Sequence, residues 1–541
     1  MTPVETFTPE EQKALAPYFT NLDKPVFAIV NLPEVVKGAL FARYSRSPKS
    51  VRRLFLDEFL GDLESADVAA RQTTQTGSER AEQLYARVLS DYGDDSVAQL
   101  GGVHLACEGV SNVLTKILER GRLMAYLEQS TRYVPYTDRV DGAWKYAVPA
   151  ELEGSELAQR FREVMDEAFD TYARWIPILE EHFRSIVPKT PGDSNFVYRQ
   201  SIRAKALDTL RGMLPAAARS NVGLYGTGQA YEALLIRMRA EPLAEVRECA
   251  DLMLEELRKV IPAFLTRVDQ EERGQRWSQF LRETRDETAH LAGEILAERS
   301  ESAEAEVHLT DFDPEGEEKV VAAALYAVSS LPDTDLLRAV RRMTAEERGA
   351  ILRAYIGRRH NRRHKPGRAF ERTSYRFDIL ADYGAYRDLQ RHRLLTTEAQ
   401  ALTPDHGYEM PSVIDEVGAS DDFRRVMERS AGLFQSISAS AAPQVAPYAV
   451  CMAYRIRFYM EMNAREAMHV IELRTSPQGH PAYRRICQEM HRLIRDEAGH
   501  AAIAGAMQFV DYSEVELERL ASERASEKKR LALSQGGQTS G

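Results

Sequence analysis

Cysteine is scarce in this sequence. The 541 residues contain only Cys107, Cys249, Cys451 and Cys487, and no two of them form a CxxC pair. This spacing argues against a disulfide framework and against a structural zinc site. A chain without such cross-links suits a reducing compartment, so we expect a cytoplasmic protein.

Long apolar runs are also missing. No uninterrupted apolar stretch is long enough to span a bilayer. The N-terminal segment MTPVETFTPEEQ lacks the charged start and the apolar core of a signal peptide. We therefore expect a soluble protein with no membrane partner.

The sequence has no excess of positive charge. Its 71 Lys and Arg residues are outnumbered by 82 Asp and Glu residues, which gives a formal net charge of -11. Nonspecific affinity for nucleic acid comes mostly from massed Lys and Arg, so we expect no nucleic-acid partner. A local basic pocket for a small anion is compatible with this balance.

Two regions of the chain share one order of features. VFAIVNLPEVVKGALFARYSRSPKSVRRLF near the start and VVAAALYAVSSLPDTDLLRAVRRMTAEERGAIL further on each have an apolar run, a Leu-Pro-acid turn and an Arg-rich helix. GRLMAYLEQSTRY and HRLLTTEAQALTP then occupy matching places, as do LRGMLPAAARSNVGLYG and VAPYAVCMAYRIRFYME. The match predicts two tandem copies of one domain.

We expect the copies to be divided by an acid-rich linker. Residues 300–319, SESAEAEVHLTDFDPEGEEK, show no strong helix or strand pattern. The predicted organisation is a first repeat over residues 1–299 with a helical insertion, a linker over 300–319, a second repeat over 320–520, and a disordered tail over 521–541 that ends in Gly, Ser and Gln.

Helical periodicity dominates both copies. Apolar residues at spacings of three and four predict helices over 151–183, 243–267, 276–299 and 482–506. Short β-rich runs over 26–30 and 131–136 predict a small sheet in each copy. The fold class is therefore predicted to be α+β.

The second copy carries a basic triplet, Arg391-His392-Arg393, and about seventy residues later the segment MNAREAMHVIELR. In this order and at this distance, the two motifs resemble the flavin-dependent thymidylate synthases. That family has an Arg-His-Arg triplet, then Asn-Glu-x-Ser-x-Arg, then a helix with Asn-x-Arg, His or Asn, and Leu-Arg. The resemblance implies that the triplet contacts FAD.

On a helix, Arg465 and His469 are i and i+4 neighbours, while Asn463 and Arg474 point in almost the same direction three turns apart. The resemblance implies that Asn463, Arg465 and His469 contact FAD and that Arg474 contacts the pyrimidine and favours ionisation of its imide. Glu371 lies where the family has a flavin-contacting acid. The alternative is an amphipathic surface helix with solvated side chains.

The first copy keeps a different set of residues. LEQSTRY retains Glu128, Gln129, Ser130 and Arg132, and the resemblance implies that they bind the nucleotide. In an extended strand, alternate residues would point the same way and converge on one phosphate and sugar. Leu127 replaces the family's Asn, and a plain polar strand face is the alternative.

The two copies have complementary losses. The second copy reads EAQALT over 398–403 where the phosphate motif belongs, and it has Pro447 where the first has the nucleotide-binding Arg211. The first copy reads Arg120-Gly121-Arg122 and Thr227-Gly228-Gln229 where the flavin motifs belong. We therefore expect one composite site per chain, formed within one chain or across two, in a homodimer that is a pseudo-tetramer of four repeats.

The resemblance implies reductive methylation of dUMP with methylenetetrahydrofolate and NADPH as co-substrates. None of the four cysteines lies in a recognisable catalytic motif, which favours flavin chemistry over attack by a thiolate. The alternatives are a flavin-dependent methylase of UMP or another pyrimidine nucleotide, and a catalytically dead nucleotide-binding scaffold.

A basic run over 358–368, RRHNRRHKPGR, fits either a phosphate or folate tail or a solvated loop. Its His360 and His364 have i, i+4 metal spacing, but no third ligand accompanies them, so we expect no metal.

Overall fold

The computed structural model describes residues 5–24, 27–44, 49–61, 99–191, 193–296 and 305–514, together with residues 520, 523–524 and 527–528. These form two compact units. The first comprises Met1–Val110, Gly121–Glu128 and Asn221–Ser300, and the second comprises Ser111–Arg120, Gln129–Ser220 and Glu301–Gly541. The second unit thus combines sequence from both predicted repeats.

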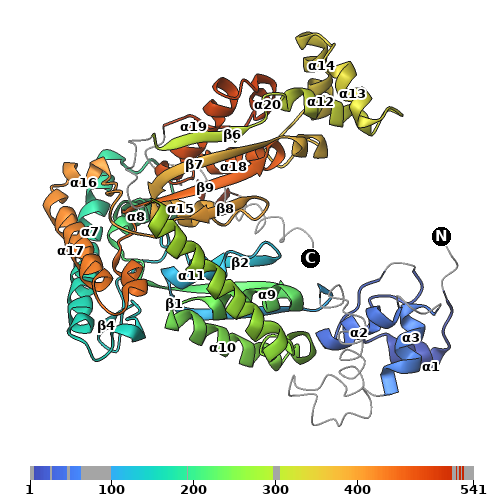
Figure 1. Cartoon of the computed structure of the whole chain (residues 1–541), viewed down its shortest axis with the longest axis horizontal. Coiled ribbons are helices and arrows are strands. Elements are labelled where there is room, and N and C mark those ends of the chain that lie inside the picture. The colour runs from blue at the N-terminus through green and yellow to red at the C-terminus, as the bar shows by residue number, and fades with distance from the viewer. Residues whose placement is uncertain are drawn as a thin grey trace. The chain divides into compact units, whose positions relative to one another are not determined.

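A four-stranded antiparallel sheet forms the centre of the second unit (Figure 1). Its strand order is β6 (Val307–Phe312), β7 (Ser374–Asp382), β9 (Arg455–Asn463) and β8 (Thr396–Ala399). Ser374 lies opposite Asn463, and Asp382 lies opposite Arg455. Alternate residues of β7, including Tyr375 and Phe377, are fully buried and form the core face, as the period of two in a strand requires.

Helices follow the two central strands directly. Asp382 ends β7 and caps α15 (Tyr383–Leu389), and Asn463 ends β9 and caps α18 (Ala464–Arg474). Each cap side chain accepts a hydrogen bond from a main-chain amide in the first turn, which stabilises the helix start. Helix α19 (Pro481–Asp496) packs against β6, β7, α15 and α18.

Further helices complete the second unit. Helix α7 (Glu156–Ile186) packs against α8 (Asn195–Leu210) and α17 (Ser420–Ser438). The other elements are α6 (Asn112–Leu118), β3 (Arg139–Val140), β4 (Ala143–Trp144), η3 (Ala150–Leu152), η4 (Arg211–Met213), α12 (Gly316–Tyr326), α13 (Asp333–Val340), α14 (Ala345–Ile356), η7 (Arg368–Arg372), α16 (Ser412–Glu416), η8 (Pro443–Ala449) and α20 (Ala501–Ala506).

The first unit is built around a three-stranded sheet in the order β1 (Gly102–Ser111), β5 (Arg219–Thr227), β2 (Met124–Glu128). The end of β1 and the start of β5 extend into the second unit. The helices of the first unit are α1 (Pro9–Leu15), α2 (Glu34–Tyr44), α3 (Val51–Glu58), α9 (Gly228–Ala240), α10 (Ala244–Arg258), η5 (Pro262–Leu265), the π-helical turn η6 (Glu271–Gln275) and α11 (Arg276–Leu296).

The two halves of the sequence fold alike. The first runs β1, α6, β2, α7, η4, β5, α9, and the second runs β7, α15, β8, α17, η8, β9, α18. In each sheet the third strand of the repeat lies between the other two, in the orders β1-β5-β2 and β7-β9-β8. The predicted α+β class with two tandem copies is therefore confirmed.

Within the second unit, equivalent segments of the two repeats pair with each other. The Ala216 amide donates to the Val450 carbonyl at 2.8 Å, and the Met452 amide donates to the Leu214 carbonyl at 2.9 Å. Pro215 and Cys451 form the bridge between these bonds. Each half thus makes the same bonds to the other, as two subunits do across a two-fold axis.

Three expectations about local structure are wrong. The segment predicted as a linker contributes β6 and the start of α12, because Val307 and Leu309 alternate into the core. Residues 131–136 form no strand: the Ser130 carbonyl accepts bonds from the amides of Tyr133 and Val134, which makes a turn. Residues 27–30 contribute only an isolated bridge at Ile29.

The predicted helices correspond to α7, to α10 with η5, to α11, and to α19 with α20. Val26 of the predicted strand and most of the predicted tail lie outside the described residues, and the boundaries of the repeats stay predictions. All four cysteines are free thiols.

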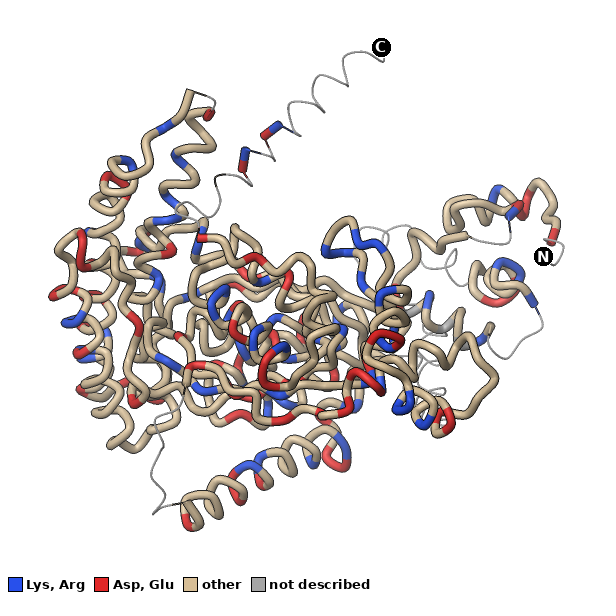
Figure 2. The backbone as a smooth tube through the Cα atoms, turned by 90° about the horizontal axis from the view of Figure 1, so that it is seen from above, with Lys and Arg blue, Asp and Glu red and all other residues tan. Residues whose placement is uncertain are grey.

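Charge is mixed along the described backbone, where basic and acidic residues alternate over short distances rather than separating by sign (Figure 2). Among the described residues, no helix is both long and apolar enough to cross a membrane.

Candidate functional site

Asp388, near the end of α15, connects arginines from both repeats. Its Oδ2 accepts a hydrogen bond from Nη1 of Arg211 at 3.3 Å, and its Oδ1 accepts one from Nη2 of Arg391. Its main-chain carbonyl accepts a bond from Nη2 of Arg474 at 2.5 Å. Burial by itself would raise the pKa of Asp388, but Arg391, Arg211 and Arg474 hold it well below the usual value, so this carboxylate stays ionised.

A second buried ion pair lies beside this cluster. Nε of Arg132 donates to both carboxylate oxygens of Asp208 at 2.7 Å, and Nη1 donates to the hydroxyl of Tyr483 at 3.2 Å. Nη1 also lies 3.4 Å from the carbonyl oxygen of Gln478. Asp208 and Arg132 come from the first repeat and Tyr483 from the second, so this pair also lies where the repeats meet.

His392 and Arg474 are joined directly. Nε of Arg474 donates to Nε2 of His392 at 2.8 Å, so Nε2 carries no proton and the imidazole proton lies on Nδ1. Nδ1 lies 3.8 Å from Oε1 of Glu466. Burial lowers the pKa of His392 to about 4, and the positive charge of Arg474 acts in the same direction. The ring is therefore neutral at pH 7 and holds the guanidinium in place.

Helix α18 presents a row of partly exposed polar groups. Arg465 donates through Nε to the Pro366 carbonyl at 2.9 Å, and its Nη1 lies 3.6 Å from Oε1 of Glu371. Nδ1 of His469 lies 3.2 Å from Oε1 of Glu466. Burial opposes ionisation of Glu466, but its contacts with His392 and His469 lower the pKa to about 2.

A pocket of about 410 Å³ opens beside the arginine cluster. The first repeat contributes Lys205, Asp208 and Arg211 to its wall, and the second contributes Asp382 and His480. Burial and the positive charges of Arg211 and Arg132 lower the pKa of His480 well below its usual value. The pocket therefore has walls from both repeats and a neutral histidine at one side.

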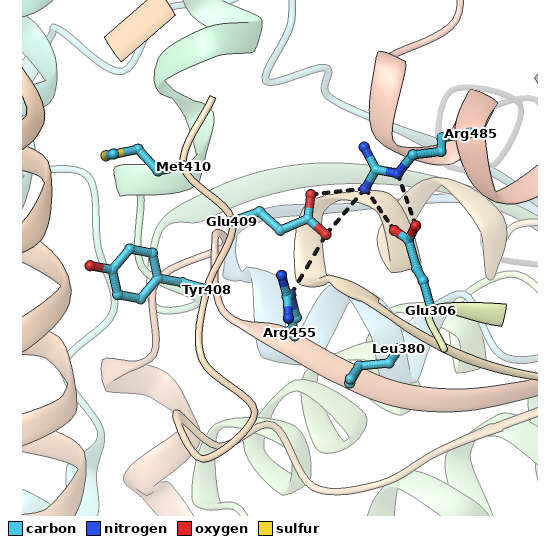
Figure 3. Close-up of a pocket in the computed structure, with 7 residues that line it drawn as sticks. All are labelled: Glu306, Leu380, Tyr408, Glu409, Met410, Arg455 and Arg485. Carbon is cyan, nitrogen blue, oxygen red and sulfur yellow. Dashed lines mark hydrogen bonds and ion pairs between the residues drawn. The ribbon is translucent and has the colours of Figure 1, made fainter. Parts of the chain in front are cut away.

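A neighbouring cavity of about 390 Å³ shares Glu409, Met410 and Arg485 with this pocket. Figure 3 shows the Arg485 guanidinium between Glu306 and Glu409, at 2.6 Å and 3.1 Å. Arg455 lies 3.8 Å from Glu409 on the other side. The charges of this cavity balance one another, so its residues form a fixed wall for the larger pocket.

The structure brings together many of the predicted site residues in one chain. Arg211 from the first repeat shares Asp388 with Arg391 and Arg474 from the second, and Arg474 also donates to His392. Arg132 contacts the second repeat through the hydroxyl of Tyr483. The hydroxyl of Ser130 accepts a hydrogen bond from the main-chain amide of Arg132 at 3.2 Å. The two residues lie in a turn rather than in the predicted strand.

Other predicted residues are outside this cluster. Glu128 ends β2 in the first compact unit, whereas Gln129 begins the next segment of the second unit. The side chain of Arg393 is exposed. Asn463 uses its side-chain oxygen to cap α18.

Sequence reasoning missed the carboxylates of the site. Asp208, Asp382, Asp388 and Glu466 have no motif of their own. The available signals were the spacings of Asp388 and Arg391 and of Glu466 and His469, each three residues apart and typical of a helical ion pair.

The basic run over 358–368 is partly structural. Arg359 is buried and donates to both oxygens of Glu472, at 2.7 Å and 2.6 Å. His392, Glu466 and His469 have ligand atoms within 4.8 Å of one another. Because the Arg474 guanidinium donates to His392, its positive charge disfavours a divalent cation there.

Comparisons with known proteins match both halves of the chain. A family model described as thymidylate synthase complementing protein matches residues 54–263 and 308–498. A UPF0159 protein of Chlamydia muridarum is 41% identical over 523 residues, which cover 96% of this chain and 98% of the relative. A UPF0159 protein of Thermoplasma acidophilum is 31% identical over 90% of this chain and 97% of the relative.

A flavin-dependent thymidylate synthase of a Mycobacterium species (strain KMS) is 32% identical over 183 residues, which are 33% of this chain and 67% of that protein. Among solved structures, a UMP/dUMP methylase from Streptomyces cacaoi bound with 5-Br dUMP covers 38% of this chain at 18% identity with a TM-score of 0.30. A likeness this weak carries no argument about function.

Proposed function

This chain belongs to the family of thymidylate synthase complementing proteins, and we propose that it is a flavin-dependent methylase with one composite site. The reaction is reductive methylation of dUMP at C5, with methylenetetrahydrofolate as the one-carbon donor and NADPH as the reductant. The observation that carries the proposal is the meeting of Arg211 of the first repeat with Arg391 and Arg474 of the second at Asp388. Beside it, the Arg132–Asp208 pair of the first repeat donates to the Tyr483 hydroxyl of the second.

Arg132 and Arg211 bind the nucleotide phosphate in this proposal. Both guanidiniums are buried, which strengthens their attraction for an anion. Each is paired with a carboxylate, Asp208 or Asp388, that preorganises it before the nucleotide arrives. Charge-assisted hydrogen bonds to phosphate are among the stronger ones in proteins.

Arg474 binds the pyrimidine ring. Two of its nitrogens are fixed by His392 and by the Asp388 carbonyl, so the orientation of the guanidinium is set by the protein. A positive group held against a ring carbonyl stabilises the negative charge that forms when the imide loses its proton. The neutral ring of His392 supports this role, because a protonated ring would repel Arg474.

The polar groups along α18 fit a flavin. The side chains of Arg465 and His469 are 32% and 29% exposed, on one face of the helix, and they offer a guanidinium and an imidazole to phosphate and carbonyl oxygens. His392 lies beside them, with its ring centroid 5.5 Å from that of His469. FAD, when bound, supplies the hydride and the one-carbon chemistry.

The thiols of the second unit support flavin chemistry over a thiolate mechanism. Cys451 and Cys487 are fully buried, and burial raises the pKa of each to about 12. A nucleophilic thiolate needs an accessible and electropositive setting. Neither residue meets that requirement.

We further propose a homodimer of two such chains, a pseudo-tetramer of four repeats. The mutual bonds between Leu214, Ala216, Val450 and Met452 support this idea, because one chain already contains a two-fold related pair of repeats. Light scattering of the purified protein tests the assembly, and a monomeric mass would contradict it.

The decisive experiment is to purify the protein, measure bound FAD, and follow tritium release from ring-labelled dUMP with methylenetetrahydrofolate and NADPH. UMP in place of dUMP is the matched arm for the alternative substrate. A protein that binds nucleotide but releases no tritium from either substrate is a scaffold. FAD titration is expected to saturate near one per chain, and two per chain would contradict the composite site.

A further inference from the structure

The two carboxylate oxygens of Asp382 differ in their hydrogen bonds among the described residues. Oδ1 accepts the Ala385 amide at 2.9 Å and so caps α15. Oδ2 is buried and has no hydrogen-bond partner among the described residues. The side chain lines the pocket of about 410 Å³. Buried polar atoms without partners are uncommon in folded proteins, and this one belongs to a pocket wall, so it is available to accept a hydrogen bond from a ligand in the pocket.

Arg211 has an unused donor beside this acceptor. Its Nη1 bonds to Asp388, but Nη2 is buried without a hydrogen-bond partner among the described residues and lies 4.0 Å from Oδ1 of Asp382. Gly384 leaves room for this arrangement. A Cβ atom there would lie 2.8 Å from Oδ1 of Asp382 and 3.1 Å from Nε and Nη2 of Arg211.

We propose that Asp382 and Arg211 form a subsite that recognises the lactam edge of a planar heterocycle, in which an N–H group stands next to a carbonyl. The ligand N–H donates to Oδ2 of Asp382, and the ligand carbonyl accepts from Nη2 of Arg211. Both a pyrimidine base and a pterin carry such an edge. A pterin is compatible with the proposed assignment of Arg211 to the nucleotide phosphate and of Arg474 to the pyrimidine, whereas a base bound here would replace that assignment. One ligand then satisfies an acceptor and a donor that are otherwise buried without partners.

The rest of the pocket suits an uncharged ring. The positive charges of Lys205 and Arg485 are matched by the negative charges of Asp208 and Glu409. Arg485 is itself held by Glu306 and Glu409, as Figure 3 shows. Met410, Pro411 and Ala453 add apolar surface. Burial raises the pKa of Asp382 to about 6, so the group remains an ionised acceptor at pH 7.5.

Calorimetric titration of the full chain with three probes at pH 7.5 tests the subsite. Deoxyuridine and folic acid both carry the lactam edge, whereas N3-methyldeoxyuridine lacks the N–H group. We expect deoxyuridine or folic acid to bind, and the one that binds shows whether the natural ligand is a pyrimidine base or a pterin. If it is the base, N3-methyldeoxyuridine should bind at least about tenfold more weakly than deoxyuridine.

Asp382→Ser is the variant that separates recognition from folding, because serine also caps helices but has only one side-chain oxygen. It should weaken binding of the lactam probe by about ten- to a hundredfold. Asp378→Ser, on the same strand, is the matched control and should leave binding unchanged. Gly384→Ala, which crowds both groups, should weaken binding as well, and Gly505→Ala, with open space around it, should not.

The proposal is overturned if neither lactam probe binds, if Asp382→Ser binds the probe as wild type does, or if deoxyuridine is the probe that binds and methylation of N3 has no effect. The inference rests on the proposed function only for the choice of probes, and binding is measured without flavin or turnover. A chain that methylates dUMP but is insensitive to Asp382→Ser refutes the subsite alone. A chain that binds the probe through Asp382 but never turns over refutes the methylase alone.

Discussion

The two repeats cap the equivalent helix in the same way, although the side chains on that helix differ in chemistry. In the first repeat, Thr227 caps α9 by accepting the Ala230 amide at 3.3 Å. In the second, Asn463 caps α18 by accepting the Glu466 amide at 2.9 Å. Thr and Asn both serve as helix caps. The helix is therefore kept in both repeats, although only the second has Arg and His at the positions of Arg465 and His469, where the first has Gln229 and Ala233.

The first repeat fills the corresponding space with its own aromatic side chains. A Cβ atom at Gly121, which corresponds to His392, would lie 2.6 Å from the hydroxyl of Tyr126. A Cβ atom at Gly228, which corresponds to Ala464, would lie 2.6 Å from Cβ of Phe264. The two repeats therefore differ in packing as well as in polar groups, because aromatic atoms of the first repeat occupy the space that a side chain at either glycine would need.

The largest expected effect comes from Arg474. Its counterpart in the first repeat is the buried Met238, ten residues after the start of α9 as Arg474 is after the start of α18. Arg474→Ala should lower turnover by about a hundred- to a thousandfold, the range for loss of one group that stabilises developing charge. FAD should remain bound, because the assigned partner of Arg474 is the pyrimidine.

Tritium release and flavin occupancy, measured on the same preparation, check this prediction. Arg239→Ala, on α9 where the partly exposed side chain pairs with Asp251, is the matched control and should change neither value. If Arg474→Ala loses flavin and activity equally, Arg474 acts on the flavin or on folding.

The comparison also shows how far sequence reasoning reaches. The Leu-Pro-acid turns predicted the repeat, and α2 and α13 both begin at the acid, Glu34 and Asp333. Local chemistry of this kind is visible in a sequence because it depends on neighbouring residues. The strand β6 was missed because only Val307 and Leu309 reach the core, and acidic residues surround them.

The site was predicted in part for the same reason. Motifs on continuous segments, such as the triplet at 391–393 and the start of α18, were identifiable. The carboxylates that hold the arginines were not, because Asp208 and Arg132 are 76 residues apart and meet only after folding. Residues 131–136 are predicted as a strand because they include β-branched and aromatic residues, and the hydrogen bonds of the turn at Ser130 outweigh this propensity.

His392 should make stability depend on pH in a way the first repeat cannot, since Gly121 stands at the matching place. The folded pKa of His392 is about 4, below an unfolded value of about 6.5. The unfolded chain therefore binds the extra proton between these values. The free energy of unfolding should fall as pH drops from about 6.5 to 4, by roughly 3 kcal/mol in total from this group, and stay level above pH 6.5.

Denaturation of wild type and of His392→Gln at several pH values gives the free energy of unfolding of each protein. The difference between the two pH dependences is the contribution of His392. Glutamine has an oxygen that accepts from Arg474 but does not titrate, so the variant should show a shallower slope. Glu466, His469 and Arg474 surround the ring and remain in both proteins, so their titration cancels to first order. Parallel slopes would show that His392 is not the buried neutral group described above.

The phosphate contacts should be confined to the first repeat. Arg132→Gln with Asp208→Asn replaces the buried ion pair by neutral groups of similar size, which avoids an unpaired buried charge. Nucleotide affinity should fall by about ten- to a hundredfold, because one charge-assisted contact is worth roughly 1.5 to 3 kcal/mol. Thr403→Ala, the counterpart of Arg132 in the second repeat, should leave affinity unchanged. Equilibrium binding of dUMP measures both, and an equal loss in the two variants would reject the division of roles.

The smallest effect tests whether Phe264 closes the first repeat. Gly228→Ala places a Cβ atom 2.6 Å from Phe264 and should destabilise the chain by about 1 to 3 kcal/mol, the usual cost of overpacking. Gly293→Ala, in α11 with nothing within 4 Å, is the control and should stabilise it by up to about 1 kcal/mol. Thermal unfolding compares the two. In a Phe264→Gly background the penalty at Gly228 should vanish, since the Cβ and ring atoms that the new methyl group meets have been removed. A penalty that persists there would mean that the backbone, rather than Phe264, forbids a side chain at this position. FAD titration of Phe264→Gly completes the test: saturation should stay at one per chain, because an opened space without Asn, Arg and His side chains has no groups to hold a second flavin.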